Sequence, residues 1–211
     1  MLFPELERLY GVPQPPRHHP EVDTGVHTFM VLDQAERLSG DPVVRFAALT
    51  HDLGKGNTPR DILPSHHGHE QRGVVLIDQL CDRYRIPNRY RELARLVAGY
   101  HGHMHRVFEL RPDTLAKTLE GLDAYRRPER VEGILLACEA DYRGRTGFEE
   151  RPYPQADYVR RAHARCLDIQ ARELVAQGLK GQAITQALRR LRIAALTELK
   201  QAHEAQAAGD P

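Results

Sequence analysis

The residues best suited to chemistry lie side by side in the run Thr50-His51-Asp52-Leu53-Gly54-Lys55-Gly56. An imidazole next to a carboxylate offers two ligands for a divalent metal ion, and the two glycines that follow allow the backbone to turn sharply. Lys55 places a cation close by. This combination predicts metal-assisted chemistry on a phosphate.

A lone His-Asp pair is weak support, because such neighbours often form only a local hydrogen bond. Four more residues of ligand type occur along the chain, and they are His27, His69, His101 and Asp141. The 12 histidines are many for 211 residues, and they cluster. Two of these residues have an alternative to the ligand role. His27 could be a core histidine bonded to a backbone carbonyl, and Asp141 could form a surface ion pair, which contributes little to stability.

Apolar residues at helical spacing predict the helices that would position these ligands. The first spans about 23–38 and carries His27. Asp41-Pro42 is typical of a helix start, with an acidic N-cap and a proline at the first helical position. The apolar helix that follows delivers His51 and Asp52 at its C-terminal end. Because adjacent helix residues point about 100° apart, we expect the helix with His27 to pack close by.

Further helices are predicted along the rest of the chain, and no strand-like alternation interrupts them, so we expect an all-α fold. They span about 74–85, 88–101, 112–122, 128–141, 155–177 and from 182 onward. His101 is still attached to its helix, so it is a better ligand candidate than His103 and His105, which are expected behind the ligands or in solvent.

Proline spacing sets the expected domain limits. Residues 1–22 are predicted to be an extended lead-in, with His18 and His19 exposed to solvent. Residues 23–204 are expected to form one domain, and 205–211 a frayed tail.

The order of the ligand candidates, His, His-Asp, His, His, Asp, resembles the HD-domain superfamily of metal-dependent phosphohydrolases, in which each of several helices supplies a ligand or a pair. The resemblance implies a single-domain helical bundle with the metal site between its helices. It implies one ion held by the set His27, His51, Asp52 and Asp141. The Gly-His-Glu step at 68–70 favours His69 over His66 and His67 as a further ligand. If His69 and His101 join, a second ion becomes possible, with Asp52 as the bridge.

Four protein ligands leave positions on an octahedral ion for water and substrate. Such an ion lowers the pKa of its water from about 15.7 toward roughly 7, so we expect in-line attack by a metal-activated water. Asp52 and Lys55 are the expected catalytic residues, with Lys55 against the substrate phosphate or holding a metal-bound carboxylate. Arg143 and Arg145 are further phosphate candidates, and their alternative is that of solvated helix-end cations. Gly54-Lys55 is not a P-loop, because Leu49 stands where that loop needs glycine.

The resemblance extends to the C-terminal HD domain of bacterial CCA-adding enzymes, the multifunctional tRNA nucleotidyltransferases, and covers most of the chain. The segments that carry it are 3–6, 11–13, 19–21, 23–28, 51–56, 66–69 and 139–148. It implies hydrolysis of 2′,3′-cyclic nucleotides, 2′-nucleotides and other phosphomonoesters, with nickel, manganese, cobalt or magnesium as the ion, nickel often serving best in that family. Those enzymes begin with a nucleotidyltransferase head that contains an Asp-x-Asp pair. This chain has no Asp-x-Asp, so we expect it not to add CCA by itself. Met1 favours a free-standing relative over an excised domain.

The composition of the chain limits the kinds of partner and compartment that we expect. The 30 Lys+Arg and 29 Asp+Glu nearly cancel, so contact with tRNA would need local patches. Cys81, Cys138 and Cys166 lack C-x-x-C spacing and are predicted to be buried thiols of a reducing compartment. Without a signal peptide or a long apolar run, we expect a cytoplasmic protein with no membrane partner. The oligomeric state is left open.

Two functions are compatible with these patterns. One is an enzyme that hydrolyses small nucleotide phosphoesters. The other is a module that binds tRNA or a partner chain and keeps a weak or vestigial metal site. The ligand set favours the enzyme, and the near-zero net charge counts against a dedicated RNA-binding protein.

Overall fold

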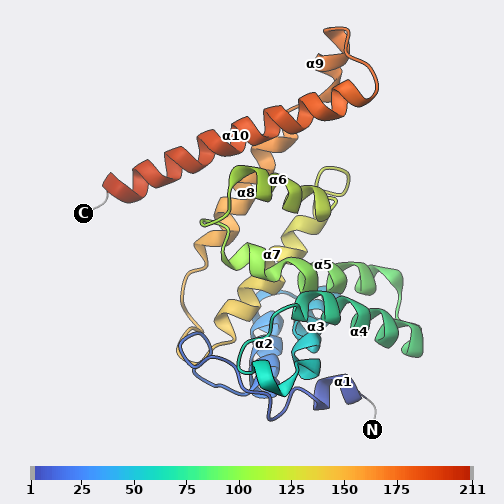
Figure 1. Cartoon of the computed structure of the whole chain (residues 1–211), viewed down its shortest axis with the longest axis vertical. Coiled ribbons are helices and arrows are strands. Elements are labelled where there is room, and N and C mark those ends of the chain that lie inside the picture. The colour runs from blue at the N-terminus through green and yellow to red at the C-terminus, as the bar shows by residue number, and fades with distance from the viewer. Residues whose placement is uncertain (1–2, 210–211) are drawn as a thin grey trace. The chain divides into compact units, whose positions relative to one another are not determined.

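The computed structural model describes residues 3–209 and confirms the all-α prediction (Figure 1). Within these residues the only strand-like pairing is an isolated antiparallel bridge between Pro13 and Asp23. The helices, including two short 3-10 turns, are α1 (Pro4–Glu7), α2 (Thr24–Leu38), α3 (Pro42–Thr50), η1 (Leu53–Asn57), η2 (Arg60–Ile62), α4 (His69–Tyr84), α5 (Asn88–His105), α6 (Pro112–Gly121), α7 (Glu129–Arg143), α8 (Pro154–Leu167), α9 (Ala171–Ala176) and α10 (Gln182–Gly209). None of the described helices is both long enough and apolar enough to cross a lipid bilayer.

The chain forms two compact units. Unit 1 comprises residues up to 105 together with 132–153, and unit 2 comprises 106–131 together with the residues from 154 onward. In unit 1, α3 packs against α2 and α5, and α4 packs against α5 and η1. Figure 1 shows α4 and α5 running side by side. All six ligand candidates therefore belong to unit 1.

The starts of α2 and α3 follow from their capping residues. Asp23 accepts a hydrogen bond from the backbone N–H of Val26, and Asp41 accepts one from that of Val43, each at 2.9 Å. Pro42 occupies the first turn of α3, where a missing N–H costs nothing. These caps confirm the predicted helix starts.

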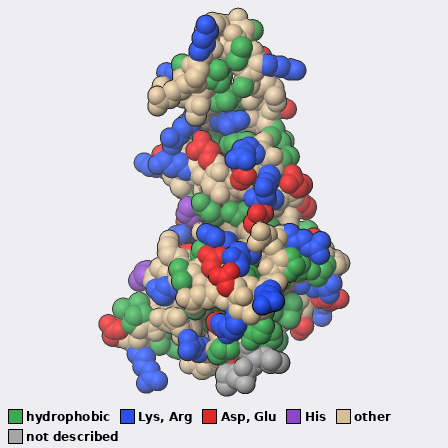
Figure 2. Space-filling model, turned by 90° about the vertical axis from the view of Figure 1, so that its right-hand side faces the viewer, with side chains coloured by type: hydrophobic (Ala, Val, Ile, Leu, Met, Phe, Trp, Pro, Cys, Tyr) green, Lys and Arg blue, Asp and Glu red, His purple; other side chains and the backbone are tan. Residues whose placement is uncertain are grey.

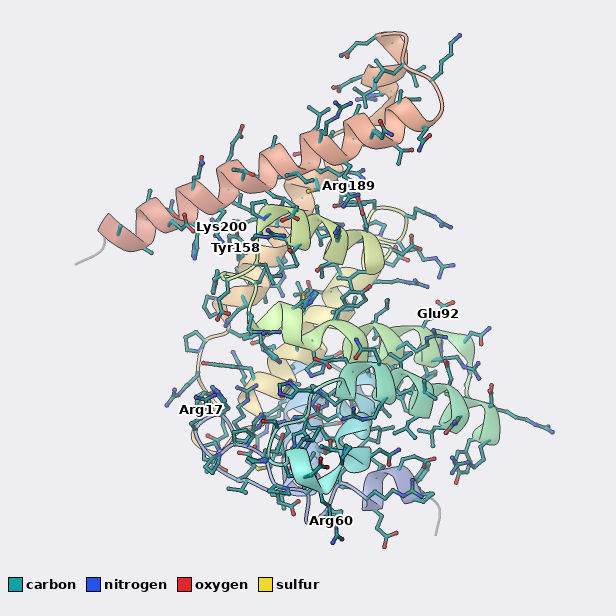
Figure 3. The ribbon with its side chains drawn as sticks, viewed as in Figure 1. Arg17, Arg60, Glu92, Tyr158, Arg189 and Lys200 are labelled. Carbon is teal, nitrogen blue, oxygen red and sulfur yellow. The ribbon has the colours of Figure 1, made fainter. Side chains whose placement is uncertain are left out.

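Unit 2 is built around α10, which packs against α6, α8 and α9. Tyr158 of α8 lies beside His203 of α10, with ring centroids 5.1 Å apart, and the ring of Phe108 stacks on the same histidine at 4.6 Å. Lys200 donates a hydrogen bond to the carbonyl of Leu110 at 3.0 Å. Figure 3 labels Tyr158 and Lys200 on their two helices.

Several predicted boundaries are wrong. Helix α5 does not end at His101 but continues through His105, because Met104 is fully buried and its packing outweighs the weak helix propensity of Gly102. The predicted helix over 155–177 is two helices, and the break allows Leu174 of α9 to become buried.

The two chain ends differ from expectation as well. The lead-in is not wholly extended, since it contains α1, and the expected frayed tail is helical as far as Gly209. Residues 210–211 of that expected tail lie outside the described part of the chain.

Candidate metal centre

Five elements of unit 1 deliver the six ligand candidates to one place. His27 comes from the first half of α2, and His51 and Asp52 follow the last residue of α3. The remaining three, on α4, α5 and α7, are His69, His101 and Asp141. All except His69 are almost fully buried, and the side chain of His69 is 15% exposed.

These side chains form two groups of metal-ligand type. The first consists of His27, His51 and Asp141, and the second of Asp52, His69 and His101. Within each group the ligand atoms lie within 4.8 Å of one another. The His27 Nε2 and Asp141 Oδ1 atoms are 3.1 Å apart, close to the roughly 3 Å between two ligands at right angles on one ion with bonds of about 2.1 Å.

Asp52 lies between the two groups. Its Oδ2 atom is 3.1 Å from His51 Nε2 of the first group. Its Oδ1 atom is 3.5 Å from His69 Nε2 and 3.7 Å from His101 Nε2. One carboxylate oxygen thus faces each group, which is the arrangement that a carboxylate bridging two ions requires.

The four imidazoles share one orientation, with Nδ1 turned to a backbone carbonyl and Nε2 turned to the carboxylates. As Nδ1–H donors they reach five backbone carbonyls: His51 to Ala48 O at 2.7 Å, His69 to His66 O at 2.8 Å, His101 to Val97 O and Ala98 O at 3.1 Å, and His27 to Gly144 O at 3.1 Å. A proton fixed on Nδ1 leaves the Nε2 lone pair free to bind a metal. Ring orientation alone therefore prepares the nitrogen ligands.

The polar atoms inside the cluster favour a bound cation. His69 Nε2 and His101 Nε2 are only 3.3 Å apart, and with both Nδ1 atoms protonated they are two acceptors that repel unless a positive charge lies between them. Among the described residues, His51 Nε2 and both oxygens of Asp52 are buried without a hydrogen-bond partner, although Lys55 Nζ lies 2.5 Å from Asp52 Oδ2. A divalent ion fits these residues, and the mixture of imidazole and carboxylate suits a first-row transition metal.

The electrostatics keep the ligands in metal-binding form. Burial opposes the charge of Asp52, but His51 and Lys55 outweigh it and hold the pKa of this carboxyl well below its usual range. The pKa of Asp141 is likewise held low, because His105 and His51 outweigh its burial. Burial lowers the pKa of His101 to about 3, so its Nε2 is unprotonated near neutral pH.

The pKa of His51 is shifted upward, opposite to the shifts of Asp52, Asp141 and His101. Burial lowers the pKa of His51, but the charges of Asp52 and Asp141 outweigh burial and raise the pKa above its ordinary value. A positive charge next to these two carboxylates is therefore favourable, whether a proton or a metal ion supplies it.

The expected phosphate residues differ in their surroundings. Lys55 Nζ reaches Asp52 and also donates to Gln14 Oε1 at 2.6 Å. Arg145 lies 3.7 Å from Asp141, and its side chain is 14% exposed. Arg143 instead pairs with Glu139 at 2.7 Å. Lys55 and Arg145 thus border the cluster, whereas the ion pair of Arg143 is with a residue outside it.

His105 lies behind a candidate ligand, one of the two places expected for it, whereas Tyr153 was not anticipated at the site. His105 Nε2 donates to Asp141 Oδ2 at 2.6 Å, and the hydroxyl of Tyr153 lies 3.0 Å from His105 Nδ1. The four-residue spacing from His101 to His105 could have revealed this contact, since i and i+4 share a helix face. The prediction that His19 is solvent-exposed is wrong: its side chain is 12% exposed and contacts Glu21 at 3.0 Å.

The sequence is similar to a known domain family and to several curated proteins. The profile of the HD domain family matches residues 24–142. Curated proteins named "Multifunctional CCA protein" match from Thioalkalivibrio sulfidiphilus at 71% identity over 200 residues (95% of this chain, 49% of that protein) and from Methylococcus capsulatus at 59% over 202 residues (95% and 48%). A third, from Teredinibacter turnerae, matches at 55% over 201 residues (95% and 49%). The chain spans about half the length of the curated relatives it matches. No solved structure matches.

Proposed function

Because the chain belongs to the HD domain family, we propose that it is a divalent-metal-dependent phosphohydrolase that acts on nucleotide phosphoesters. The substrate classes are 2′,3′-cyclic phosphodiesters, 2′-nucleotides and other phosphomonoesters. The observation that carries this proposal is the set of four inward-facing Nε2 atoms around two buried carboxylates, with Asp52 between the two groups.

The ligand residues would hold one ion in each group. His27, His51 and Asp141 would hold the first, with Asp52 shared, and His69 and His101 would complete the second. When bound, such ions supply an acidified water and polarise a phosphoryl oxygen. Nickel, manganese, cobalt and magnesium remain the candidate metals, and the imidazole-rich donor set favours the first three.

The chain's other residues fix and complement this set. Lys55 neutralises and orients Asp52, and His105 holds Asp141 by a hydrogen bond to its Oδ2 atom. Arg145 borders the cluster 3.7 Å from Asp141 with 14% of its side chain exposed, so it is placed to meet a substrate phosphate. Lys55 is nine-tenths buried between Asp52 and Gln14, which favours the orienting role over direct contact with phosphate.

The test is hydrolysis of 2′,3′-cyclic AMP by the purified chain with nickel, manganese, cobalt, magnesium or zinc. Asp52→Asn and Asp52→Ala should lower kcat/KM by at least about 100-fold, because they remove the shared carboxylate. Asp61→Ala changes an exposed carboxylate of η2 and should keep native activity. Absence of turnover with every metal and with 2′-AMP and p-nitrophenyl phosphate, in protein that binds metal, would reject the proposal.

Binding to tRNA is a second candidate, suggested by the name of the curated relatives. Figure 2 shows Lys and Arg side chains intermixed with Asp and Glu on the face it displays, rather than gathered into one basic patch. The balance of 30 Lys+Arg and 29 Asp+Glu in the whole chain favours the enzyme. A module that binds tRNA through several phosphates would retain tRNA at moderate salt, with an affinity that falls steeply as salt rises.

A further inference from the structure

The lead-in segment places a carboxylate behind the first metal group. Glu21 lies two residues before the N-cap of α2, and its side chain is only 2% exposed. Its Oε1 atom is 2.9 Å from His27 Nδ1, the nitrogen that faces away from Asp141. From these contacts we propose that Glu21 is a positioning residue that orients His27 for metal binding. The inference rests on the proposed function, since it deepens the role of the same site.

Both carboxylate oxygens of Glu21 have hydrogen-bond partners. Oε1 also accepts a hydrogen bond from His19 Nδ1 at 3.0 Å, and Oε2 accepts one from the backbone N–H of Thr146 at 3.3 Å. The N–H of His27 Nδ1 faces both Glu21 Oε1 and Gly144 O, so this shared donor and two further donors fix the buried carboxylate. A carboxylate held in this way fixes the ring plane of His27, keeps the proton on Nδ1 and makes Nε2 a stronger ligand.

The backbone next to Glu21 is strained in a way that supports this placement. Val22 has a φ of +60°, a left-handed conformation that is costly for a β-branched residue. The conformation is held by two backbone hydrogen bonds, from Val22 N to His19 O at 2.9 Å and from Gln14 N to Val22 O at 2.8 Å. The turn over residues 19–22 therefore aims Glu21 inward at a cost that the surrounding contacts must offset.

A competing interpretation treats His19, Glu21 and His27 as a third metal site, since their ligand atoms lie within 4.8 Å of one another. In that case His27 would bind one ion through Nδ1 and another through Nε2, which requires removal of both ring protons. The Nδ1 atom of His27 also faces the carbonyl of Gly144 at 3.1 Å, as expected for an N–H donor. The geometry favours orientation over ligation.

The test compares metal binding by native chain, Glu21→Gln, Glu21→Ala and His19→Ala after metal removal and titration with Co²⁺ or Mn²⁺. We expect Glu21→Gln to weaken binding about 10-fold and Glu21→Ala up to about 100-fold, with the number of bound ions unchanged. The Co²⁺ absorption spectrum should shift in both variants. Glu21→Gln is nearly isosteric, so it remains informative if Glu21→Ala fails to fold. Glu7→Gln, at an exposed glutamate of α1, should behave as native.

Two outcomes would overturn the inference alone. Native affinity and a native Co²⁺ spectrum in both Glu21→Gln and Glu21→Ala would show that Glu21 does not act on His27. Loss of one bound ion in His19→Ala would instead show that His19, Glu21 and His27 hold an ion of their own, with Glu21 as a ligand. Binding of no divalent ion by the native chain would overturn both this inference and the proposed function. If metal binds and Glu21→Gln weakens it, yet no phosphoester is hydrolysed, the proposed function fails while the inference stands.

Discussion

At the scale of single residues, Lys55 shows how much the site depends on groups that bind no metal. Its ammonium is almost fully buried between the carboxylate of Asp52 and the amide oxygen of Gln14. A buried cation is costly unless it is paired and hydrogen-bonded, and both conditions are met here. Removing it would leave Asp52 as a buried charge that only its histidine neighbours compensate.

Lys55→Met should therefore lower the free energy of unfolding of the metal-free chain by about 3 kcal/mol. The exposed Lys117→Met is the matched control and should stay within about 0.5 kcal/mol of native. Urea denaturation followed by circular dichroism measures both. Equal stability of the two variants would mean that Lys55 does not compensate Asp52.

Glu5, a buried carboxylate of unit 1 outside the metal cluster, gives a pH-dependent prediction. Burial tends to raise the pKa of Glu5, but the hydrogen bond and charge of Arg83, a backbone hydrogen bond and the charge of Arg8 together outweigh burial and lower the pKa from 4.5. Since the folded-state pKa is lowered, this pair contributes stability above pH 4.5 and loses the contribution as pH falls through the folded-state value.

Glu5→Gln should accordingly cost about 1 kcal/mol of unfolding free energy at pH 7. The difference from the native chain should shrink as the pH is lowered below 4.5. Urea denaturation series at pH 7, 5 and 3.5 provide the measurement. A difference that stays constant over this range would contradict the role of the Arg83 pair.

At the scale of elements, the junction between α3 and η1 controls the geometry of Asp52. Gly54 follows the His-Asp pair, and a Cβ atom there would lie 2.0 Å from the carbonyl oxygen of His69 and 2.6 Å from the backbone N of Gly73. Both contacts are with backbone, which cannot move aside as a side chain can. Because Gly54 has no side chain, η1 can lie against the N-terminus of α4, which begins at His69.

Gly54→Ala should destabilise the chain by at least about 3 kcal/mol and weaken metal binding at the group that contains His69. Gly73→Ala, on the other side of the same contact, is the matched control: its Cβ would lie 3.5 Å from the nearest atom, an ordinary distance, and alanine is the better helix former by about 1 kcal/mol. Thermal unfolding should move in opposite directions for the two variants. A tolerated Gly54→Ala would refute the close approach.

The helices also show what periodicity can and cannot predict. The cap at Asp41 was readable because a side-chain acceptor followed by proline and helical spacing is a local signal. The continuation of α5 through His105 was not, because it depends on burial of Met104, a tertiary effect. The same division holds for the site. The candidate ligands were recognisable by type and order, whereas Glu21 and Gln14 reach it from loops through contacts that no spacing encodes.

At the scale of the whole molecule, the candidate ligands all belong to unit 1, and α8, α9 and α10 of unit 2 contribute none of the six. Unit 1 is discontinuous in sequence, because Asp141 comes from α7 after 26 residues that belong to unit 2. A bound ion would therefore connect segments of unit 1 that are far apart along the chain. Such a connection stabilises the folded state by mass action.

Metal removal should for this reason change hydrogen exchange unevenly. At an ion concentration 100 times Kd, binding stabilises the folded chain by about 2.7 kcal/mol. The amides that exchange only when the ligand-bearing helices open should therefore exchange about 100-fold more slowly with metal than without it. We expect this protection in α2, α3, α4, α5 and the second half of α7, and little change in α9 and α10. Hydrogen-exchange mass spectrometry with metal, with chelator, and with Asp52→Asn in the presence of metal would measure it. Equal slowing of α10 and α3 would mean that the chain opens as one unit, and no slowing in α3 would argue against an ion at His51 and Asp52.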